Sequence, residues 1–321
     1  KTIISLFLFL PIIKFYNNIL TETTGYALSL FFVSFISKLI FNFSIKNLCW
    51  STVFVIMLLL LRKQFVFLYP LVLLLYSGIF ILNKSKKKFL WISVCILSIF
   101  LVPIFFTSLN KHIIESSNGK KIYQDLDGYG LYYFTYIDSI YISNINDVDL
   151  FENQNVKNTF YKIFEEMDKQ KMLIKYYDGR GHFGKSFASI RDNSTNLLLD
   201  LAAKENTTIN DLKKKISIKL ISTNFDKYIF LLFKKFYDST WLFIFIAFFI
   251  FIASLIAFIK NKSHLSLLTI FISTFTLSNH SIVYLFGRVQ PRYLIYSDFI
   301  LIMYIFIIFL TFIHINNKVQ K

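Results

Sequence analysis

The sequence is poor in cysteine, glycine and proline, and each shortage removes a class of protein from consideration. The two cysteines, Cys49 and Cys95, both lie in apolar runs, so they offer no disulfide framework and no metal-ligand spacing. Nine glycines and four prolines in 321 residues form no low-complexity linker. The prolines also lack the paired breaks in matching halves that an inverted-repeat transporter carries. What remains is a chain dominated by long apolar runs.

Charged residues are also scarce, at 17% of the chain against 55% hydrophobic residues. The apolar residues gather in eight stretches, which are residues 3–20, 25–45, 48–61, 65–82, 89–109, 241–259, 265–286 and 293–315. Most are long enough, at about 1.5 Å of rise per residue, to cross a hydrocarbon layer about 30 Å thick. The weakest stretch, 48–61, has the length of a half-crossing helix. We therefore predict an all-α polytopic membrane protein with about eight transmembrane helices.

The formal net charge of +16 does not indicate nucleic-acid binding, because of where the charges lie. Residues 110–238 hold 19 Lys and Arg against 17 Asp and Glu, so most of the excess lies in or beside the apolar stretches. The charge bias of membrane proteins explains such an excess. We expect membrane lipid as a partner and no nucleic acid.

Basic residues in the short connections between spans predict the orientation of the chain, because Lys and Arg are retained in the cytoplasm. One face holds nine of them: Lys46, Lys84, Lys86, Lys87, Lys88, Lys260, Lys262, Lys318 and Lys321. The other face holds four: Arg62, Lys63, Arg288 and Arg292. The nine-cation face is predicted to be cytoplasmic in a cytoplasmic (inner) membrane. The chain then divides into transmembrane helices in 1–109, an extracytoplasmic domain in 110–238, and transmembrane helices with a short cytoplasmic tail in 239–321.

The polar segment mixes β-prone and helical patterns. Residues 123–142 are rich in Tyr and Ile and are broken by Gly128 and Gly130, which predicts extended structure and turns. Residues 155–177, 193–204 and 209–220 have helical periods or helix start signals. The segment is therefore predicted to be a small α or α+β cap.

Residues 179–186 of this segment match the phosphate-loop pattern. In that pattern, glycine-rich backbone holds phosphates, a lysine such as Lys185 reaches the terminal phosphates, and a hydroxyl such as Ser186 holds Mg²⁺. A nucleotide fold needs a parallel sheet, which this short and irregular segment does not provide. The predicted compartment also has little nucleoside triphosphate. We interpret the match as a flexible loop.

Two pairs of aspartates in the segment have the spacing i, i+2. Asp125 with Asp127, and more weakly Asp147 with Asp149, could hold a divalent cation together with a sugar diphosphate, because hard cations prefer carboxylate oxygens. Solvated turns use aspartate just as freely. A divalent cation at the first pair is the single cofactor that the sequence suggests.

Polar residues at the predicted outer face form the more informative set. Arg62, Lys63, Arg288 and Arg292 lie in outer turns, Glu22 lies between the first two spans, and His280 and Asp298 lie within about two turns of the last outer turn. Each cation alone is explained by snorkelling to the interface. Their convergence on one face instead predicts a site for an anionic head group.

At this point four features of the chain resemble a known family. They are Leu20-Thr21-Glu22 at the entry to a span, an apolar run ending in Arg62, the segment 196–202, and the closing Pro291-Arg292-Tyr293-Leu294. With their spacing, they resemble the membrane glycosyltransferases of the GT-C class. The closest resemblance is to bacterial members related to protein mannosyltransferases and lipid A aminoarabinose transferases.

The resemblance implies a donor sugar on a polyprenyl phosphate and a glycan, lipid or protein acceptor outside the cytoplasmic membrane. It also implies a catalytic carboxylate in an external loop that we expect upstream of Lys1, which leaves Glu22 as the candidate within the chain. The expected substrate-binding residues are Glu22, Arg62, Lys63, Arg288, Arg292 and Tyr293. Arginine suits a departing lipid phosphate because its fork binds two oxygens at once. An outer-leaflet oligosaccharide polymerase or ligase, which could use His182, and a transporter or sensor remain as alternatives.

Overall fold

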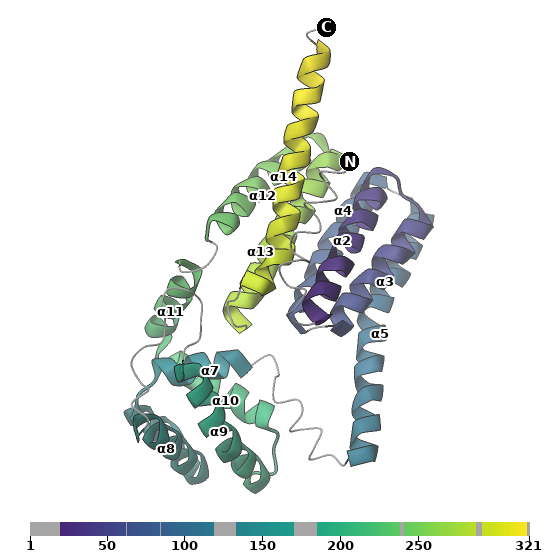
Figure 1. Ribbon diagram of the computed structural model, residues 1–321. Helices are drawn as coiled ribbons and strands as arrows, with labels where there is room; N and C mark the ends of the chain where they lie inside the picture. The colour runs from purple at the N-terminus through teal and green to yellow at the C-terminus, as the bar shows by residue number, and fades with distance from the viewer. Residues whose placement is uncertain are drawn as a thin grey trace. The chain divides into compact units, whose positions relative to one another are not determined.

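The computed structural model describes residues 20–61, 63–83, 85–118, 133–169, 185–237, 241–286 and 291–319 (Figure 1). Every element within these ranges is helical, and they contain no strand. The chain divides into two compact units. The first consists of Lys1–Thr107, Leu242–Ile282 and Pro291–Lys321, and the second of Ser108–Trp241 and Val283–Gln290.

The first unit contains the apolar helices. They are α2 (Leu20–Phe41), α3 (Ile45–Leu61), the 3₁₀ helix η1 (Lys63–Phe67), α4 (Leu68–Asn83), α5 (Lys86–Asn118), α12 (Trp241–Asn261), α13 (His264–Phe286) and α14 (Pro291–Val319). The last turns of α5 and α13 belong to the second unit. Among the residues that the structure describes, five segments are long and apolar enough to cross a membrane: Thr24–Phe41, Gln64–Leu82, Lys86–Asn110, Leu242–Asn261 and His264–Leu285. Two shorter apolar helices, Ile45–Leu61 and Tyr296–Thr311, accompany them. Of the predicted stretch 3–20, residues 3–19 lie outside the described residues.

Large apolar side chains cover the outer surface of α5 and α12. Ile104 and Phe105 on α5 are 61% and 63% exposed, and Phe249 and Ile259 on α12 are 66% and 69% exposed. Soluble proteins rarely expose contiguous apolar surface on this scale, because each Å² in contact with water costs about 25 cal/mol. A hydrocarbon environment removes that cost. The helices therefore support a multi-pass membrane protein.

Three helix connections of the first unit meet at one end. Phe41, the last residue of α2, stacks on His264, the first residue of α13, with ring centroids 6.2 Å apart. Lys88, in the first turn of α5, lies 4.8 Å from the centroid of the Phe43 ring between α2 and α3. We call this the basic end, because the chain near these turns carries Lys46, Lys86, Lys87, Lys88, Lys260 and Lys262. Six of the nine lysines that predict the cytoplasmic face thus lie near one end of the unit.

Gly78 allows α4 to pack closely against α13. A Cβ atom at position 78 would lie 2.5 Å from Cδ1 of Leu267, so Leu267 would have to move. At Gly25 the nearest atom, Cδ2 of Leu61, would lie 3.4 Å from an added Cβ, which is ordinary contact. An alanine would therefore clash with a neighbouring side chain at position 78 but not at position 25.

We expect Gly78→Ala and Leu267→Ala to be coupled. The added methyl group should be more favourable by about 1 kcal/mol when Leu267 has been shortened, because the clash is then absent. A double-mutant cycle removes the helix propensity of alanine from the comparison. Denaturation of the chain in mixed micelles measures the four free energies of unfolding. Gly25→Ala combined with Leu267→Ala is the control, and equal coupling in both cycles would contradict the close contact.

The second unit is a small helical domain with its own core. Its helices are α7 (Tyr133–Ile142), η3 (Ile145–Leu150), α8 (Gln154–Lys169), α9 (Lys185–Lys204), α10 (Ile209–Thr223) and α11 (Phe225–Tyr237). All but η3 contribute to the buried cluster of Tyr136, Ile137, Ile140, Phe160, Ile163, Phe164, Leu198, Leu201, Leu212, Ile216, Leu220, Tyr228 and Leu231. The helical period predicted over 155–177 is confirmed for 155–169, and the helix predicted over 209–220 is confirmed. The helix predicted over 193–204 begins earlier, at Lys185.

Two predictions for this segment are wrong. The extended structure predicted over 123–142 is a helix from Tyr133 to Ile142, because Tyr136, Ile137 and Ile140 fall on one helical face that enters the core. The flexible loop predicted over 179–186 is wrong for Lys185 and Ser186, which open α9. Residues 123–132 and 179–184 lie outside the described part.

The amino group of Lys213 lies in an environment that disfavours its charge. Lys213 is 3% exposed on α10, and burial lowers its pKa from 10.5 to about 8. Below pH 8 the folded unit therefore holds a buried charge that the unfolded chain exposes to water. Between pH 8 and 10.5 the unfolded chain binds a proton that the folded chain lacks.

We therefore expect stability of the second unit to rise with pH in this window, by up to about 3 kcal/mol in total. Lys213→Met should remove that rise and stabilise the unit at pH 7, because no charge is then buried. Lys215→Met, an exposed neighbour on α10, is the matched control. Urea titration of the full chain in mild detergent, read from a fluorophore attached at Ser222→Cys, measures the slope. A slope unchanged by Lys213→Met would contradict this account.

Candidate functional site

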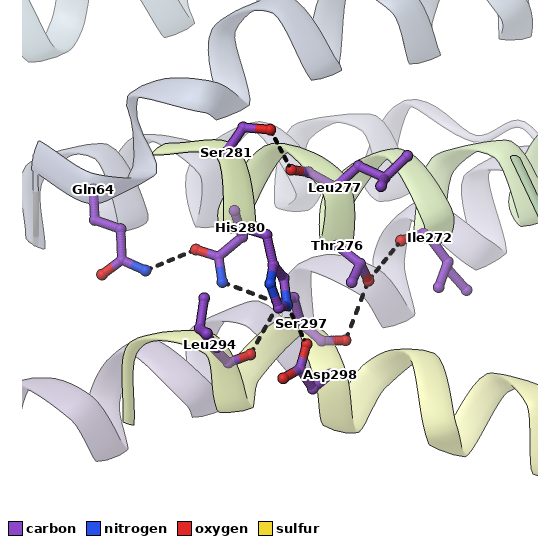
Figure 2. A network of polar contacts seen from close by, with 10 residues as sticks. Gln64, Ile272, Thr276, Leu277, His280, Ser281, Leu294, Ser297 and Asp298 are labelled. Carbon is purple, nitrogen blue, oxygen red and sulfur yellow. Dashed lines mark hydrogen bonds and ion pairs between the residues drawn. The ribbon is translucent and has the colours of Figure 1, made fainter. Parts of the chain in front are cut away.

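A network of polar side chains connects η1, α13 and α14 inside the first unit (Figure 2). Gln64 donates from Nε2 to Oδ1 of Asn279 at 2.7 Å, and Nδ2 of Asn279 donates to Oγ of Ser297 at 3.0 Å. The hydroxyl of Thr276 donates to the backbone oxygen of Ser297 at 3.3 Å. Asn279, Ser297 and Thr276 are all fully or nearly fully buried. Helices in an apolar environment use such contacts because a buried amide or hydroxyl needs a partner.

A carboxyl and an imidazole pair lies in the same network. Nε2 of His280 on α13 is 2.5 Å from Oδ1 of Asp298 on α14, and the residues are 1% and 7% exposed. Asp298 and Glu22 are the two acidic residues that the sequence has outside 110–238. An ionisable group inside a span is costly and is rarely retained without a role. Pairing lowers the cost for both groups.

The helix ends around this network gather into one region, which we call the polar end. Tyr26 on α2 meets the ring of Phe299 on α14 edge to face, with centroids 6.1 Å apart. Phe65 in η1 lies 6.0 Å from the ring of Tyr296 on α14, and a Cβ at Gly25 on α2 would be 3.6 Å from Phe65. The N-terminal parts of α2 and α14, the 3₁₀ helix η1, and α13 around Asn279 and His280 therefore form one end of the unit.

The predicted site residues belong to these elements. Glu22 is the third residue of α2, Lys63 is the first residue of η1, and Arg292 and Tyr293 are the second and third residues of α14, although the positions of their side chains are not described. Arg62, Arg288, Asp125 and Asp127 lie outside the described residues. The structure thus brings together backbone elements that carry four of the predicted residues. It does not describe how their side chains meet.

Sequence reasoning selected His280 and Asp298 but missed the amides and hydroxyls beside them. Gln64, Asn279, Ser297 and Thr276 complete the network. A signal was present, because residues 273–281 contain seven polar residues in an otherwise apolar span. Such density on a membrane helix predicts a helix contact through hydrogen bonds.

The second unit has a groove between the end of α7 and α11. It has a volume of about 750 Å³ and is lined by Tyr141, Ile142, Ser143, Asn144, Asp226, Lys227, Phe230, Leu231 and Lys234. Nζ of Lys227 donates to Oδ1 of Asn224 at 2.9 Å, so that lysine is held at the edge of the groove. The same two helices are joined by an ion pair between Lys235 and Asp138, whose side chains are fully buried. This pair fastens α11 to α7.

The second aspartate pair has structural partners. Oδ2 of Asp147 accepts from the backbone N–H of Asn144 at 2.8 Å and from Nδ2 of Asn224 at 3.1 Å. Asp149 is exposed, and its carboxylate lies 3.7 Å from Nζ of Lys157. Within the described ranges, no group of three or more His, Cys, Asp or Glu could hold a metal ion. Asp147 thus caps η3 and connects it to Asn224 at the end of α10, whereas Asp149 lies beside α8.

The polar end combines a fixed His280–Asp298 pair with elements that carry Lys63 and Arg292. Cations at the end of an apolar bundle are suited to an anionic lipid head group, and a nearby carboxylate is suited to a hydroxyl or a cation. Comparison of the chain with protein-family models, with curated proteins and with solved structures finds no match.

Proposed function

We propose that the protein is an integral-membrane glycosyltransferase of the GT-C type. It moves a sugar from a polyprenyl-phosphate donor to a glycan, lipid or protein acceptor on the extracytoplasmic side of the cytoplasmic membrane. About eight transmembrane helices and a cap in residues 110–238 belong to the proposal. The observation that carries it is the buried network of Gln64, Asn279, Ser297, His280 and Asp298, which joins η1 and α14, the elements bearing Lys63, Arg292 and Tyr293.

The proposed chemistry assigns a task to each group. Arg62 and Arg292 bind the lipid phosphate through two oxygens each, and Lys63 and Arg288 add positive charge as the phosphate departs. Glu22, the candidate carboxylate within the chain, orients the acceptor hydroxyl. The ring of Tyr293 completes the wall of the head-group site.

His280 and Asp298 act as positioning residues in this proposal. Their 2.5 Å contact fixes α13 against α14, and Arg292 lies six residues before Asp298 on the same helix. The hydrogen bond between Asn279 and Ser297, at 3.0 Å, also fixes the position of α13 along α14. The network therefore limits how far α14 can rotate or slide. A cation at its first turn then keeps its place, as a preorganised phosphate site requires.

A proton-coupled transporter is the second candidate, and one observation favours it. Ionisable pairs inside membrane spans occur in proton relays, and His280 with Asp298 is such a pair. In a transporter, Asp298→Asn would abolish uptake driven by a pH gradient. In the proposed transferase, the same change leaves the reaction independent of any gradient. No described residue favours the polymerase, ligase or sensor alternatives.

Binding of the donor's lipid phosphate tests the proposed function without requiring the catalytic carboxylate. The chain in nanodiscs is titrated with a labelled polyprenyl monophosphate and, separately, with the matching polyprenol. We expect the phosphate form to bind at least about tenfold more tightly, which corresponds to about 1.4 kcal/mol. Equal binding of the two lipids would show that the polar end does not recognise phosphate.

A further inference from the structure

Helix α11 exposes an apolar face although it belongs to a folded unit. Phe225, Phe230 and Phe233 are 56%, 72% and 67% exposed. The opposite face is buried in the core through Tyr228 and Leu231. The helix is thus apolar on two sides, and the core of the second unit uses one of them.

The position of α11 in the chain indicates what covers the other side. The helix ends at Tyr237, and the candidate span of α12 begins at Leu242. Five residue steps reach at most about 18 Å, so the end of α11 is covalently tied close to the end of a membrane span. Trp241, at the start of α12, is a residue type enriched at the membrane interface.

The charges of α11 suit the lipid head-group layer. Lys227 and Lys234 are exposed, and their spacing of seven residues puts them on one side of the exposed phenylalanines. Asp226 is the acidic residue on the exposed face, in the first turn of the helix. Phenylalanines with lysines along one edge are the pattern of a helix that lies in the interface plane.

A second copy of the chain is less suited than a bilayer to cover the exposed face of α11. The three phenylalanines expose about 400 Å² together, taking roughly 200 Å² for each full side chain. A stable protein interface needs about 800 Å² from each partner. A bilayer needs no such minimum, because it already surrounds the neighbouring span.

We propose that α11 lies in the membrane interface, with Phe230 and Phe233 among the upper acyl chains and Lys227 and Lys234 at the lipid phosphates. The helix anchors the second unit to the bilayer surface through its buried contacts with α7. This anchoring holds whether or not the protein transfers sugars.

Depth-dependent fluorescence quenching tests the proposal in the full chain. Cys49 and Cys95 are replaced by alanine, and single cysteines are introduced by Phe233→Cys or by Asp226→Cys, which keeps all three phenylalanines. An environment-sensitive dye is attached in vesicles of phosphatidylcholine and phosphatidylglycerol. Lys215→Cys, on an exposed position of α10, is the matched control.

We expect dyes at 226 and 233 to emit at shorter wavelength than the dye at 215 and to be quenched by lipids brominated in the upper acyl chain. The dye at 215 should be quenched by aqueous iodide instead. In the Asp226→Cys chain, adding Phe230→Asp and Phe233→Asp should reduce the lipid quenching at least threefold. Iodide quenching at all three sites would overturn the proposal. Protection from both quenchers at 226 and 233 would also overturn it, because a protein surface would then cover α11.

Discussion

Breaking the buried ion pair between Lys235 and Asp138 is expected to destabilise the second unit by about 3 to 5 kcal/mol. Both side chains are completely buried, and they connect α11 to α7. Lys235→Met removes the buried counter-ion of the Asp138 carboxylate, and Asp138→Asn removes that of the Lys235 ammonium. Tyr228 lies in the same environment. Burial, and secondarily the charge of Asp138, raise the pKa of its hydroxyl. Each single change therefore removes much of the stability of a small domain.

The double variant Asp138→Leu with Lys235→Met distinguishes the effect of the two charges from the effect of filling the two buried positions. It replaces two charges with apolar groups of similar size, so its stability should return to within about 1 kcal/mol of the parent. Lys219→Met, an exposed change on α10, is the control. Urea titration of the full chain in mild detergent, with the fluorophore at Ser222→Cys, measures all four. Single variants as stable as the control would contradict the burial of an ionised pair.

Replacing Arg62 or Arg292 with alanine is expected to have the largest effect on function. If each guanidinium contacts the donor phosphate in a desolvated site, its loss should cost about 2 to 5 kcal/mol, or roughly 30-fold to several thousand-fold in donor turnover. Arg→Lys should already reduce turnover, because a point charge does not replace contact with two oxygens. The protein as its gene encodes it is assayed in proteoliposomes.

The control for the arginines is Lys46→Ala, which removes an exposed cation from the basic end of the same unit. It changes net charge equally, but Lys46 is the second residue of α3 at the basic end, away from the polar end, so turnover should remain within about twofold of the parent. Comparable losses in Lys46→Ala and Arg292→Ala would point to a general effect of charge on membrane insertion. Unchanged turnover in both arginine variants would mean that Arg62 and Arg292 only anchor helices at the interface.

Apolar composition predicted the helices of the first unit because it reflects a single physical requirement. A run of about 20 apolar residues must satisfy its backbone internally, which a helix does. Helix α10 was predicted equally well, and its start is fixed by Thr208, whose hydroxyl accepts from the N–H of Asp211 at 3.1 Å. The prediction over 123–142 failed because Tyr and Ile favour strands on average, whereas Tyr136, Ile137 and Ile140 pack in a helical period.

The candidate site was only partly predictable for a different reason. Composition marks His280 and Asp298 as unusual, but their pairing depends on the register of α13 against α14, which no local pattern encodes. The contact of Gln64 with Asn279 joins residues 215 positions apart and depends on the whole bundle. The hydrogen bond of Asn279 with Ser297 depends on the same register.

Release of free polyprenyl phosphate tests the central claim most directly. The protein as its gene encodes it is sealed in proteoliposomes with polyprenyl-phosphate sugars and candidate acceptors, without an ion gradient. We predict that free polyprenyl phosphate appears in step with the glycosylated acceptor, and that Arg292→Ala slows both at least about 30-fold. Intact donor after long incubation, together with accumulation of a solute that requires a pH gradient and Asp298, would contradict the glycosyltransferase and establish a transporter.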